Sequence, residues 1–376
     1  MSDTDRPWLV IAGGGTGGHL YPGLAVAEAL RAERPEWHVS VFGTTRPIDE
    51  RLVSPRGYEL VKQVVRAFPS RPWQWPGFLL SWRRAVKEVR ARFDEERPAV
   101  VLGLGGYAAG PAIHVAVKMG IPTAIFNPDA VPGRANRALG PKVNRVFVQW
   151  EDTALHFERA KDVRCTGCPI RPGFIGAKRD EAIAKLKLDP AKKNLLITGA
   201  SQGARSINLA ILQLLDDFKK LPDWHIIHLT GEADLQACRE AYRQAGLKAH
   251  TIDYTENMPG CMAAADLVVS RAGASTLAEI TAMRLPAVLM PYPYDRKKHQ
   301  LANARVLVQA NAAELVEDSG DAAENAKRLR PILRQLMHSD EARRRLARTA
   351  GSLSRNNAAE TIAQELLDLA GVAERV

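Results

Sequence analysis

A glycine-rich loop between a short apolar strand and an amphipathic helix, all within residues 8–30, is the most constraining feature of this sequence. The loop spans residues 13–19 and reads GGGTGGH, with Gly13, Gly15 and Gly18 at the spacing of dinucleotide-binding folds. Glycines have no Cβ, so backbone N–H groups approach a ligand closely, and the following helix N-terminus adds partial positive charge. The pattern predicts a phosphate or diphosphate site after the first strand.

The same succession of strand, glycine loop and helix recurs along the chain, at residues 99–119, 194–218 and 266–283. Such alternation is typical of α/β folds with parallel sheets. At 376 residues the chain is long enough for two ordinary domains. We predict two Rossmann-like domains, residues 1–164 and 165–350, and a last helix within 351–376 that folds back over the first domain. The turn-rich segment 163–171 (VRCTGCPIR) is expected to be a linker.

Composition indicates a soluble globular protein, with 25% charged and 46% hydrophobic residues. The acidic start, MSDTDRPW, does not resemble a signal peptide, and no apolar run reaches the roughly 18 residues that a membrane span requires. We therefore expect a cytoplasmic protein. The net charge of +10 favours an anionic partner, whether nucleic acid, a nucleotide diphosphate or an acidic membrane surface.

The sequence offers no obvious metal site. Of the four cysteines, Cys165 and Cys168 form one CxxC pair without a second pair, which favours reduced, incidental thiols. The DxD pair at residues 3–5 lies before the first strand and is expected to be solvated. A bound diphosphate would then be neutralised by loop N–H groups, helix dipoles and arginine, with Arg171 and Arg205 as candidates.

Glycine loops also occur in three other kinds of site. An NAD site expects an acidic residue after the second strand, but Phe42 is followed by GTT. A P-loop needs lysine where the sequence has His19. Residues 199–203 (GASQG) match the nucleophile elbow of a serine hydrolase, with Asp295 and His299 downstream. A hydrolase gives no use for the first glycine loop, so it is kept only as an alternative.

Residues 66–84 (RAFPSRPWQWPGFLLSWRR) mix aromatic, aliphatic and basic side chains. Aromatic rings favour the lipid headgroup region and arginine is attracted to anionic lipid, so the stretch is interpreted as a membrane-surface patch. The alternative is a helical hairpin that uses the same aromatics as core. The patch residues are Trp73, Trp75, Phe78, Leu79, Trp82, Arg83 and Arg84.

In combination, six motifs over nearly the whole chain resemble the MurG family, glycosyltransferases that add N-acetylglucosamine to the lipid-linked muramyl-pentapeptide precursor of peptidoglycan. The motifs are GGGTGGHLYP at 13–22, GGY at 105–107, GCPIR at 167–171, SQGAR at 201–205 with Asn208, RAGAST at 271–276 with Glu279, and His299-Gln300 with Asn303.

The resemblance implies a GT-B architecture, in which two Rossmann-like domains face each other across a cleft, and inverting chemistry without a cofactor or an essential metal. The implied substrates are UDP-N-acetylglucosamine and undecaprenyl-pyrophosphoryl muramyl-pentapeptide, with transfer to the 4-hydroxyl converting lipid I to lipid II. The first domain would bind the acceptor and the membrane, and the second would bind the donor. An anionic membrane surface is the further implied partner, with no nucleic acid. The implied location is peripheral, on the cytoplasmic face of the inner membrane.

The resemblance also implies the donor site. Ser201 and Arg171 would lie near the diphosphate, the backbone around Thr255 near uracil, and Glu279 near the ribose hydroxyls. The N-terminus of the helix at 274–276 would stabilise the leaving UDP. Gln300 and Asn303 would bind the sugar. The implied donor-binding residues are Thr16, Gly17, Gly18, Arg171, Ser201, Gln202, Gly203, Thr255, Ala274, Ser275, Thr276, Glu279, Gln300 and Asn303.

The acceptor's diphosphate would lie on the first domain's loops, near residues 16–18 and at Gly14, Gly15, Gly105, Gly106 and Tyr107. A general base must take the proton of the attacking hydroxyl, and His19 is the first candidate because histidine titrates near neutrality. The alternative is that His19 only hydrogen-bonds a phosphate or orients the loop.

One stretch departs from the family. Where the family usually reads His-Glu-Gln-Asn, this chain has FNPD at residues 126–129, and Cys168 stands at a common asparagine position. Phe126 and Pro128 cannot replace polar functions, although Asp129 offers a carboxylate as base or sugar ligand. A relative with another lipid acceptor, and a non-catalytic relative that binds the UDP-sugar, therefore remain alternatives.

Overall fold

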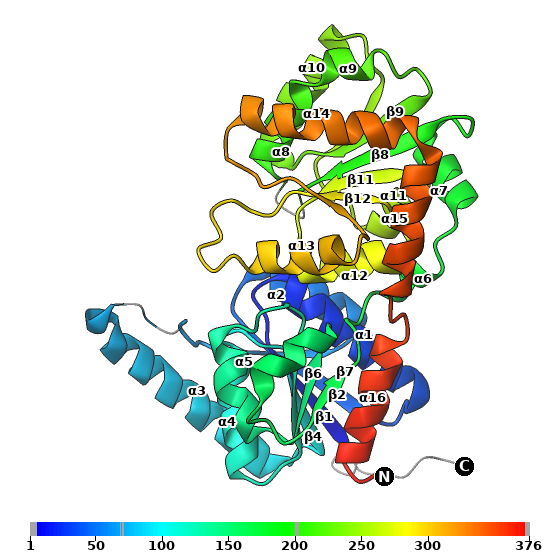
Figure 1. Ribbon diagram of the computed structural model, residues 1–376. Coiled ribbons are helices and arrows are strands. Elements are labelled where there is room, and N and C mark those ends of the chain that lie inside the picture. The colour runs from blue at the N-terminus through cyan, green and yellow to red at the C-terminus, as the bar shows by residue number, and fades with distance from the viewer. Residues whose placement is uncertain (1–5, 68, 70, 200–202, 373–376) are drawn as a thin grey trace. The chain divides into compact units, whose positions relative to one another are not determined.

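The computed structural model describes residues 6–67, 69, 71–199 and 203–372, and divides the chain into two compact units (Figure 1). The first unit contains residues 1–171 and 355–376, and the second contains residues 172–354. The second unit is therefore inserted into the chain of the first. The break falls after Arg171, later than the boundary at residue 164 expected from the sequence.

Seven parallel strands form the sheet of the first unit: β1 (Trp8–Ala12), β2 (His38–Gly43), β3 (Glu59–Lys62), β4 (Val100–Gly103), β5 (Thr123–Asn127), β6 (Arg145–Val148) and β7 (Val163–Cys165). Their order is β3-β2-β1-β4-β5-β6-β7. The order reverses between β1 and β4, the kind of position where open α/β sheets bind ligands beyond the carboxyl ends of their strands.

The helices of the first unit are α1 (Gly17–Glu33), α2 (Pro47–Val53), α3 (Trp75–Glu95), α4 (Ala109–Lys118), α5 (Arg134–Leu139) and α16 (Ala358–Leu369). Short 3₁₀ helices cover Ser54–Arg56, Pro72–Gln74, Gly140–Lys142 and Glu151–Phe157.

The β1 strand shows how the sequence builds a two-sided core. All five of its residues are buried, as expected for a strand covered by helices on both faces. Trp8 and alternate residues pack with α3 and α4, where Trp8 and Phe93 meet edge to face with centroids 5.7 Å apart. On the other face, the lack of a side chain at Gly23 lets α1 pack closely on the sheet, since a Cβ there would lie 3.1 Å from Cγ2 of Ile11.

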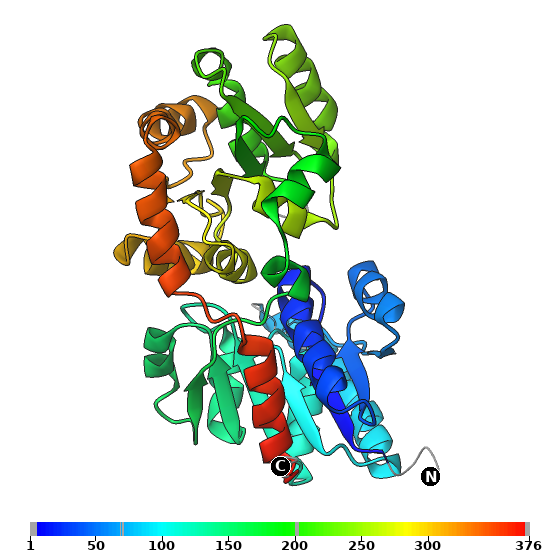
Figure 2. The same ribbon diagram turned by 90° about the vertical axis from the view of Figure 1, so that its right-hand side faces the viewer.

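Helix α16 belongs to the first unit and packs against α1 and β4 (Figure 2). Ile362, Leu366 and Leu367 are completely buried there. The chain thus returns to the first sheet after the whole second unit.

The expectation of a linker at residues 163–171 is wrong for its first part. Residues 163–165 form β7, the edge strand that pairs in parallel with β6 from Val146 to Val148. A three-residue edge strand with one exposed side chain carries no alternating apolar pattern, which explains why it resembled a linker.

Six parallel strands form the second sheet: β8 (Lys193–Thr198), β9 (Trp224–Leu229), β10 (Ala249–Ile252), β11 (Leu267–Ser270), β12 (Ala287–Leu289) and β13 (Glu314–Leu315). Their order, β10-β9-β8-β11-β12-β13, reverses between β8 and β11. Two parallel α/β sheets thus confirm the predicted fold class. The core of one face joins Leu195 and Ile197 of β8 with Ile207 and Ile211 on the next helix.

The helices of the second unit are α6 (Pro172–Ile175), α7 (Arg179–Leu186), α8 (Arg205–Leu212), α9 (Leu215–Phe218), α10 (Leu235–Gln244), α11 (Met258–Ala264), α12 (Ala274–Ala282), α13 (His299–Gln309), α14 (Ala322–His338) and α15 (Asp340–Ser352), with a 3₁₀ helix at Glu232–Asp234. Across the part of the chain that the structure describes, no helix combines the length and the apolar character needed to cross a bilayer.

The packing of α16 predicts that Leu366→Ala lowers the free energy of unfolding of the first unit by about 2–5 kcal/mol, because it leaves a cavity in a completely buried position. Urea denaturation followed by tryptophan fluorescence measures this, since six of the seven tryptophans lie at residues 8–150. Glu360→Ala on the exposed face of the same helix is the control. Equal effects of the two changes would contradict the packing described.

Candidate functional site

The first glycine loop follows β1 and approaches its neighbours so closely that side chains do not fit. A Cβ on Gly13 would lie 2.8 Å from the Cβ of Leu104, and Gly15 has a φ of +83°. The Gly13 N–H donates to the carbonyl of Phe42 (3.0 Å). These positions need glycine because of their backbone geometry and close contacts.

Asp49 binds the backbone of this loop through its side chain. Sequence reasoning did not identify this residue. Its fully buried carboxylate accepts from the Gly15 N–H (2.7 Å), the Thr44 N–H (2.6 Å) and the Thr44 hydroxyl (2.9 Å). Arg46 donates to the carbonyl of Gly15 (2.9 Å). The Gly15 N–H is therefore turned toward Asp49, so a phosphate on this loop would use other donors.

His19 lies in the first turn of α1. Its Nδ1 is 2.9 Å from the Thr16 hydroxyl, and a Cβ on Gly106 would lie 3.8 Å from its Cε1 and 4.0 Å from its Nε2. Burial lowers the pKa of His19 from its ordinary value of 6.5, although the charges of Asp129 and Asp49 oppose this shift. The ring is thus a neutral imidazole near pH 7, with Nε2 on the side of the second glycine loop.

The loop after β5 is braced by two buried asparagines. Asn136 donates through Nδ2 to the Asn127 side-chain oxygen (3.0 Å) and to the Phe126 carbonyl (3.2 Å), and Asn127 donates to the Asp129 carbonyl (2.7 Å). Phe126 is buried, at 2% exposure. The departure at 126–129 thus contributes an apolar core residue and a half-buried carboxylate whose charge acts on His19.

The loop after β4 completes this group. Gly105 and Gly106 both have positive φ values, +83° and +70°, and a Cβ on Gly105 would come within 3.0 Å of the Asn136 amide. The loops after β1, β4 and β5 therefore meet at the carboxyl edge of the first sheet. Tyr107 follows them as a half-buried residue.

Arg171 lies at the end of the first unit, not in the second as expected from the sequence. Its guanidinium lies over the ring of Tyr21, 4.4 Å from the centroid. The arginine is thus held beside the helix that follows the first glycine loop.

The aromatic stretch at 66–84 divides into packed and exposed side chains. Trp82 packs against α4, where a Cβ on Gly110 would lie 2.8 Å from its ring and His114 is 5.8 Å away between centroids. In contrast, Trp73 and Leu80 are 70% and 72% exposed. The N-terminal end of α3 projects away from the sheet of its unit (Figure 1).

Other patch residues show the same division. Trp75 and Leu79 are exposed, as are Arg83 and Arg84. Phe78 is half-buried and lies between the rings of Trp75 and Trp82.

In the second unit, the loop after β8 contains Ser201 and Gln202, which lie outside the described residues. Gly203 has a φ of +72°, and a Cβ there would clash with the carbonyl oxygen of Thr230. Ser201 is also the elbow serine of the hydrolase alternative. Asp295, its supposed partner, instead accepts from the backbone N–H groups of Lys297 (3.1 Å) and Gln300 (3.2 Å) at the start of α13.

The first turn of α8 carries a second polar group. Arg205 donates to Asp234 (3.2 Å), and Asn208 donates to Asp234 (2.8 Å) and to the Thr230 carbonyl (2.8 Å). His228 is 3.0 Å from the Asn208 oxygen, and burial lowers its pKa to about 3. His228 is therefore a neutral structural residue at physiological pH.

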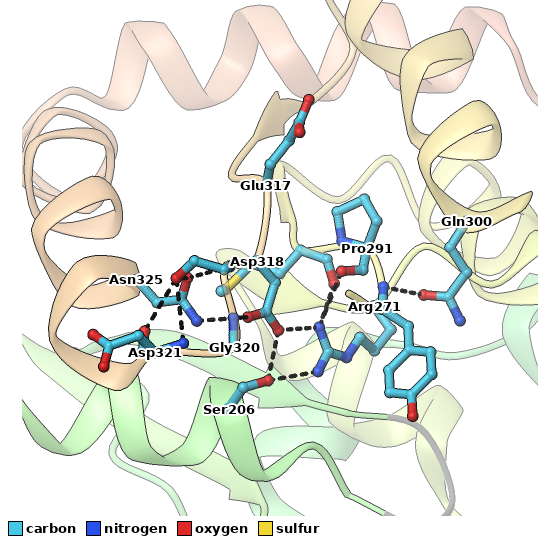
Figure 3. A network of polar contacts seen from close by, with 12 residues as sticks. Ser206, Arg271, Pro291, Gln300, Glu317, Asp318, Gly320, Asp321 and Asn325 are labelled. Carbon is cyan, nitrogen blue, oxygen red and sulfur yellow. Dashed lines mark hydrogen bonds and ion pairs between the residues drawn. The ribbon is translucent and has the colours of Figure 1, made fainter. Parts of the chain in front are cut away.

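The loop after β11 leads into the N-terminus of α12, with Ala274, Ser275 and Thr276 in its first turn and Gly273 as N-cap. Arg271, just before this loop, forms a buried ion pair with Asp318 (2.7 Å; Figure 3). Asp318 was not found by sequence reasoning, because nothing in its local sequence resembles a site motif.

Most of the remaining predicted donor residues form hydrogen bonds with backbone groups of the second unit. Asn303, fully buried, donates to the Ala272 carbonyl (3.3 Å). Gln300 accepts from the Tyr292 N–H (2.9 Å), and the Thr255 hydroxyl accepts from the Asn257 N–H (3.0 Å). Glu279 is half-buried on α12.

The four cysteines are free thiols. Among the residues that the structure describes, no group of three or more His, Cys, Asp or Glu side chains is arranged to hold a metal ion. The DxD pair at residues 3–5 lies outside the described residues.

Comparison with known proteins identifies the class. Residues 9–148 match the glycosyltransferase family 28 N-terminal domain, and residues 194–366 match its C-terminal domain. The crystal structure of Acinetobacter baumannii MurG superposes with a TM-score of 0.74 at 25% identity, covering 96% of this chain and 99% of that one. The fold and the two sets of loops therefore define a GT-B glycosyltransferase.

Within that class the chain belongs to the MurG family. It is 37% identical over 369 residues to a protein of Myxococcus xanthus, covering 96% of this chain and 92% of the relative. It is 35% identical to a protein of Halothermothrix orenii, covering 96% and 99%. Both relatives are named UDP-N-acetylglucosamine--N-acetylmuramyl-(pentapeptide) pyrophosphoryl-undecaprenol N-acetylglucosamine transferase. The family resemblance seen in the sequence is confirmed.

The contacts of Asp49 predict that Asp49→Asn lowers the free energy of unfolding by about 1–3 kcal/mol, because an amide nitrogen would face a buried N–H donor. Urea denaturation measures the change. Glu50→Gln is the matched control, since the neighbouring Glu50 is exposed and pairs with Lys62 at the surface. The role given to Asp49 is wrong if both variants unfold like the wild type.

Proposed function

We propose that this chain transfers N-acetylglucosamine from UDP-N-acetylglucosamine to the 4-hydroxyl of undecaprenyl-pyrophosphoryl muramyl-pentapeptide, converting lipid I to lipid II in peptidoglycan synthesis. The observation that carries the proposal is the match over 96% of the chain to relatives named for this reaction. The glycine loops at the switch points of both sheets support it, because each is suited to a diphosphate.

The donor is assigned to the second unit. The first turn of α12, residues 274–276, presents helix N–H groups to the negative charge that develops on the leaving UDP. Glu279 on the same helix would accept from the ribose hydroxyls, and the backbone around Thr255 would contact uracil. Gln300 would bind the sugar, and Asn303, buried against the Ala272 carbonyl, would support the loop after β11. Ser201 and Arg171 are the predicted contacts of the donor diphosphate.

The acceptor is assigned to the first unit, with its diphosphate near residues 14–18 and 105–107. His19 would act as general base in a single inverting displacement. The acceptor oxygen bonds to the anomeric carbon as the bond from that carbon to UDP breaks, and the hydroxyl proton passes to Nε2 of His19. In this role Nδ1 carries the hydrogen and donates it to the Thr16 hydroxyl, which orients the ring and leaves Nε2 free to accept the proton. The nearby charge of Asp129 stabilises the imidazolium that forms.

The stretch at 126–129 supports a second candidate, a related transferase with another lipid acceptor. Phe126 is part of the core and Asn127 is used to brace its own loop, so Asp129 is the polar side chain that this stretch offers. A transferase acting on a different lipid-linked sugar would use the same donor site and a changed acceptor contact.

We further propose that the enzyme works as a peripheral protein on the cytoplasmic face of the membrane, docked through the exposed part of the 66–84 patch. Trp73 and Leu80 supply apolar surface, and Arg83 and Arg84 supply positive charge near them in sequence. The net charge of +10 is consistent with attraction to an anionic leaflet.

The transferase proposal predicts turnover of UDP-N-acetylglucosamine with a short-chain lipid I analogue that persists in excess EDTA. His19→Ala should lower kcat by roughly 10²-fold or more, because a positioned base contributes about that much. Since the pKa of His19 is lowered, the acid limb of the pH profile of kcat/KM should fall below pH 6.5 and vanish in the variant.

Asp129→Asn tests the other candidate base in the same assay. If His19→Ala is silent and Asp129→Asn loses about 10²-fold, the base is Asp129 rather than His19. Binding of UDP-N-acetylglucosamine without transfer to lipid I would favour the second candidate, and transfer to other lipid-linked sugars would then be measured. Absence of UDP-N-acetylglucosamine binding would refute the transferase proposal altogether.

The membrane proposal predicts that the double variant Trp73→Ala, Leu80→Ser binds vesicles of phosphatidylglycerol and phosphatidylethanolamine roughly tenfold or more weakly than the wild type, because it removes two exposed apolar anchors. Vesicle sedimentation measures the affinity. Leu155→Ser is the control, since Leu155 is 72% exposed elsewhere on the same unit. An equal loss in both variants would mean that the patch is not the docking site.

A further inference from the structure

One buried carboxylate in the second unit contacts several of the segments that surround the candidate donor site. The side chain of Asp318, 0% exposed, follows β13 at the edge of the sheet (Figure 3). Its Oδ2 accepts from Nη1 of Arg271 (2.7 Å) and from the hydroxyl of Ser206 (2.5 Å). Its Oδ1 accepts from the Gly320 N–H (2.8 Å) and from Nδ2 of Asn325 (2.6 Å). The carboxylate thus has four donors.

Arg271 extends these contacts to two more segments. Its Nη1 also donates to the carbonyls of Met290 (2.9 Å) and Pro291 (3.2 Å), just after β12. Its Nη2 donates to the hydroxyl of Ser206 (2.8 Å) in the first turn of α8. Arg271, Asp318 and Ser206 therefore form a closed triangle of hydrogen bonds, which fixes the positions of all three side chains.

The residues that meet here lie next to different loops of the candidate donor site. Ser206 follows the glycine loop after β8, and Arg271 opens the loop that leads to residues 274–276 at the start of α12. The carbonyl of Pro291 precedes Tyr292, whose N–H donates to Gln300. Arg271 also lies over the ring of Tyr292, 5.7 Å from the centroid.

The segment after β13 is held against the same group. Gly320 has a φ of +81°, and a Cβ there would lie 2.9 Å from the Tyr294 hydroxyl. Burial favours the neutral form of Asp318, but the hydrogen bonds from Ser206, Arg271, Gly320 and Asn325 outweigh it and keep the pKa below its usual value. The Asp318 carboxyl is therefore ionised at neutral pH.

We propose that Asp318 is a positioning residue for the UDP-sugar donor: by fixing Arg271 and Ser206 it sets the mutual geometry of the loops after β8, β11 and β12. The inference rests on the proposed function. Asp318 need not touch the donor, because its effect passes through the backbone of the loops that do. Such preorganisation of binding loops contributes to affinity without adding a contact.

A positioning role predicts a specific kinetic change. Asp318→Asn keeps the shape of the side chain but puts either an amide N–H against Arg271 or a neutral oxygen in place of the carboxylate. The Kd for UDP and the KM for UDP-N-acetylglucosamine should rise roughly tenfold or more, while the KM for the lipid I analogue stays unchanged. Calorimetric titration with UDP and steady-state kinetics with each substrate varied measure these constants.

Two comparisons separate positioning from general destabilisation. Asp321→Asn is the matched control, because Asp321 is exposed, three residues away, and caps α14 by accepting from the Glu324 N–H (2.8 Å), a contact that asparagine can also make. Ser206→Ala removes two of the three hydrogen bonds of the triangle but leaves the ion pair between Arg271 and Asp318 intact. It should therefore give a smaller rise in the Kd for UDP, with little risk to folding. Combined with Asp318→Asn it should add less than its separate effect, since both act on one group.

The possible results are distinct. A folded Asp318→Asn protein that binds UDP as the wild type does overturns the inference, as does an equal rise in the KM of both substrates. If Asp318→Asn does not fold, the result for Ser206→Ala decides: an unchanged Kd for UDP overturns the inference and a raised one supports it. A wild-type protein that fails to bind UDP refutes the proposed function itself, and the inference with it.

Discussion

Buried carboxylates hold the loops at the carboxyl ends of both sheets, because they accept hydrogen bonds from backbone N–H groups and from arginine. In the first unit Asp49 accepts from N–H groups of the loops after β1 and β2. In the second unit Asp318 accepts from Arg271, just after β11, and from Ser206 in the first turn of α8. A glycine loop can adopt many conformations, so its shape depends on such partners. Asp49 thus holds the first glycine loop, and Asp318 holds the side chains of Arg271 and Ser206.

The elements that carry the glycine loops could be predicted from the sequence, because buried parallel strands appear as short apolar runs and glycines mark their ends. The partners of those loops could not. Asp49 lies 34 residues beyond Gly15 and Asp318 lies 47 beyond Arg271 in the chain, and only the sheet topology brings them together. Local pattern carries no information about such distant pairs.

The linker and the domain boundary predicted near residue 164 differ from the structure for a related reason. The edge strand β7 has three residues and β13 has two, which is too short for any periodic signal. Arg171 was expected in the second domain because the boundary was drawn before the GCPIR motif, and it belongs instead with Tyr21 in the first. His19 was predicted from the sequence as a candidate base, but its lowered pKa depends on burial, and the opposing charges come from Asp49 and Asp129 in other segments.

The return of α16 to the first unit has a consequence for how the protein is made. A ribosome releases β1 to β7 well before α16, and the whole of the second unit emerges between them. Until then the surface of α1 and β4 that α16 covers stays open to water or to other chains, although Leu366 and Leu367 are needed to seal it. The first unit therefore cannot complete its core until the whole second unit has been synthesised, and until then it exposes apolar surface that can associate with other chains.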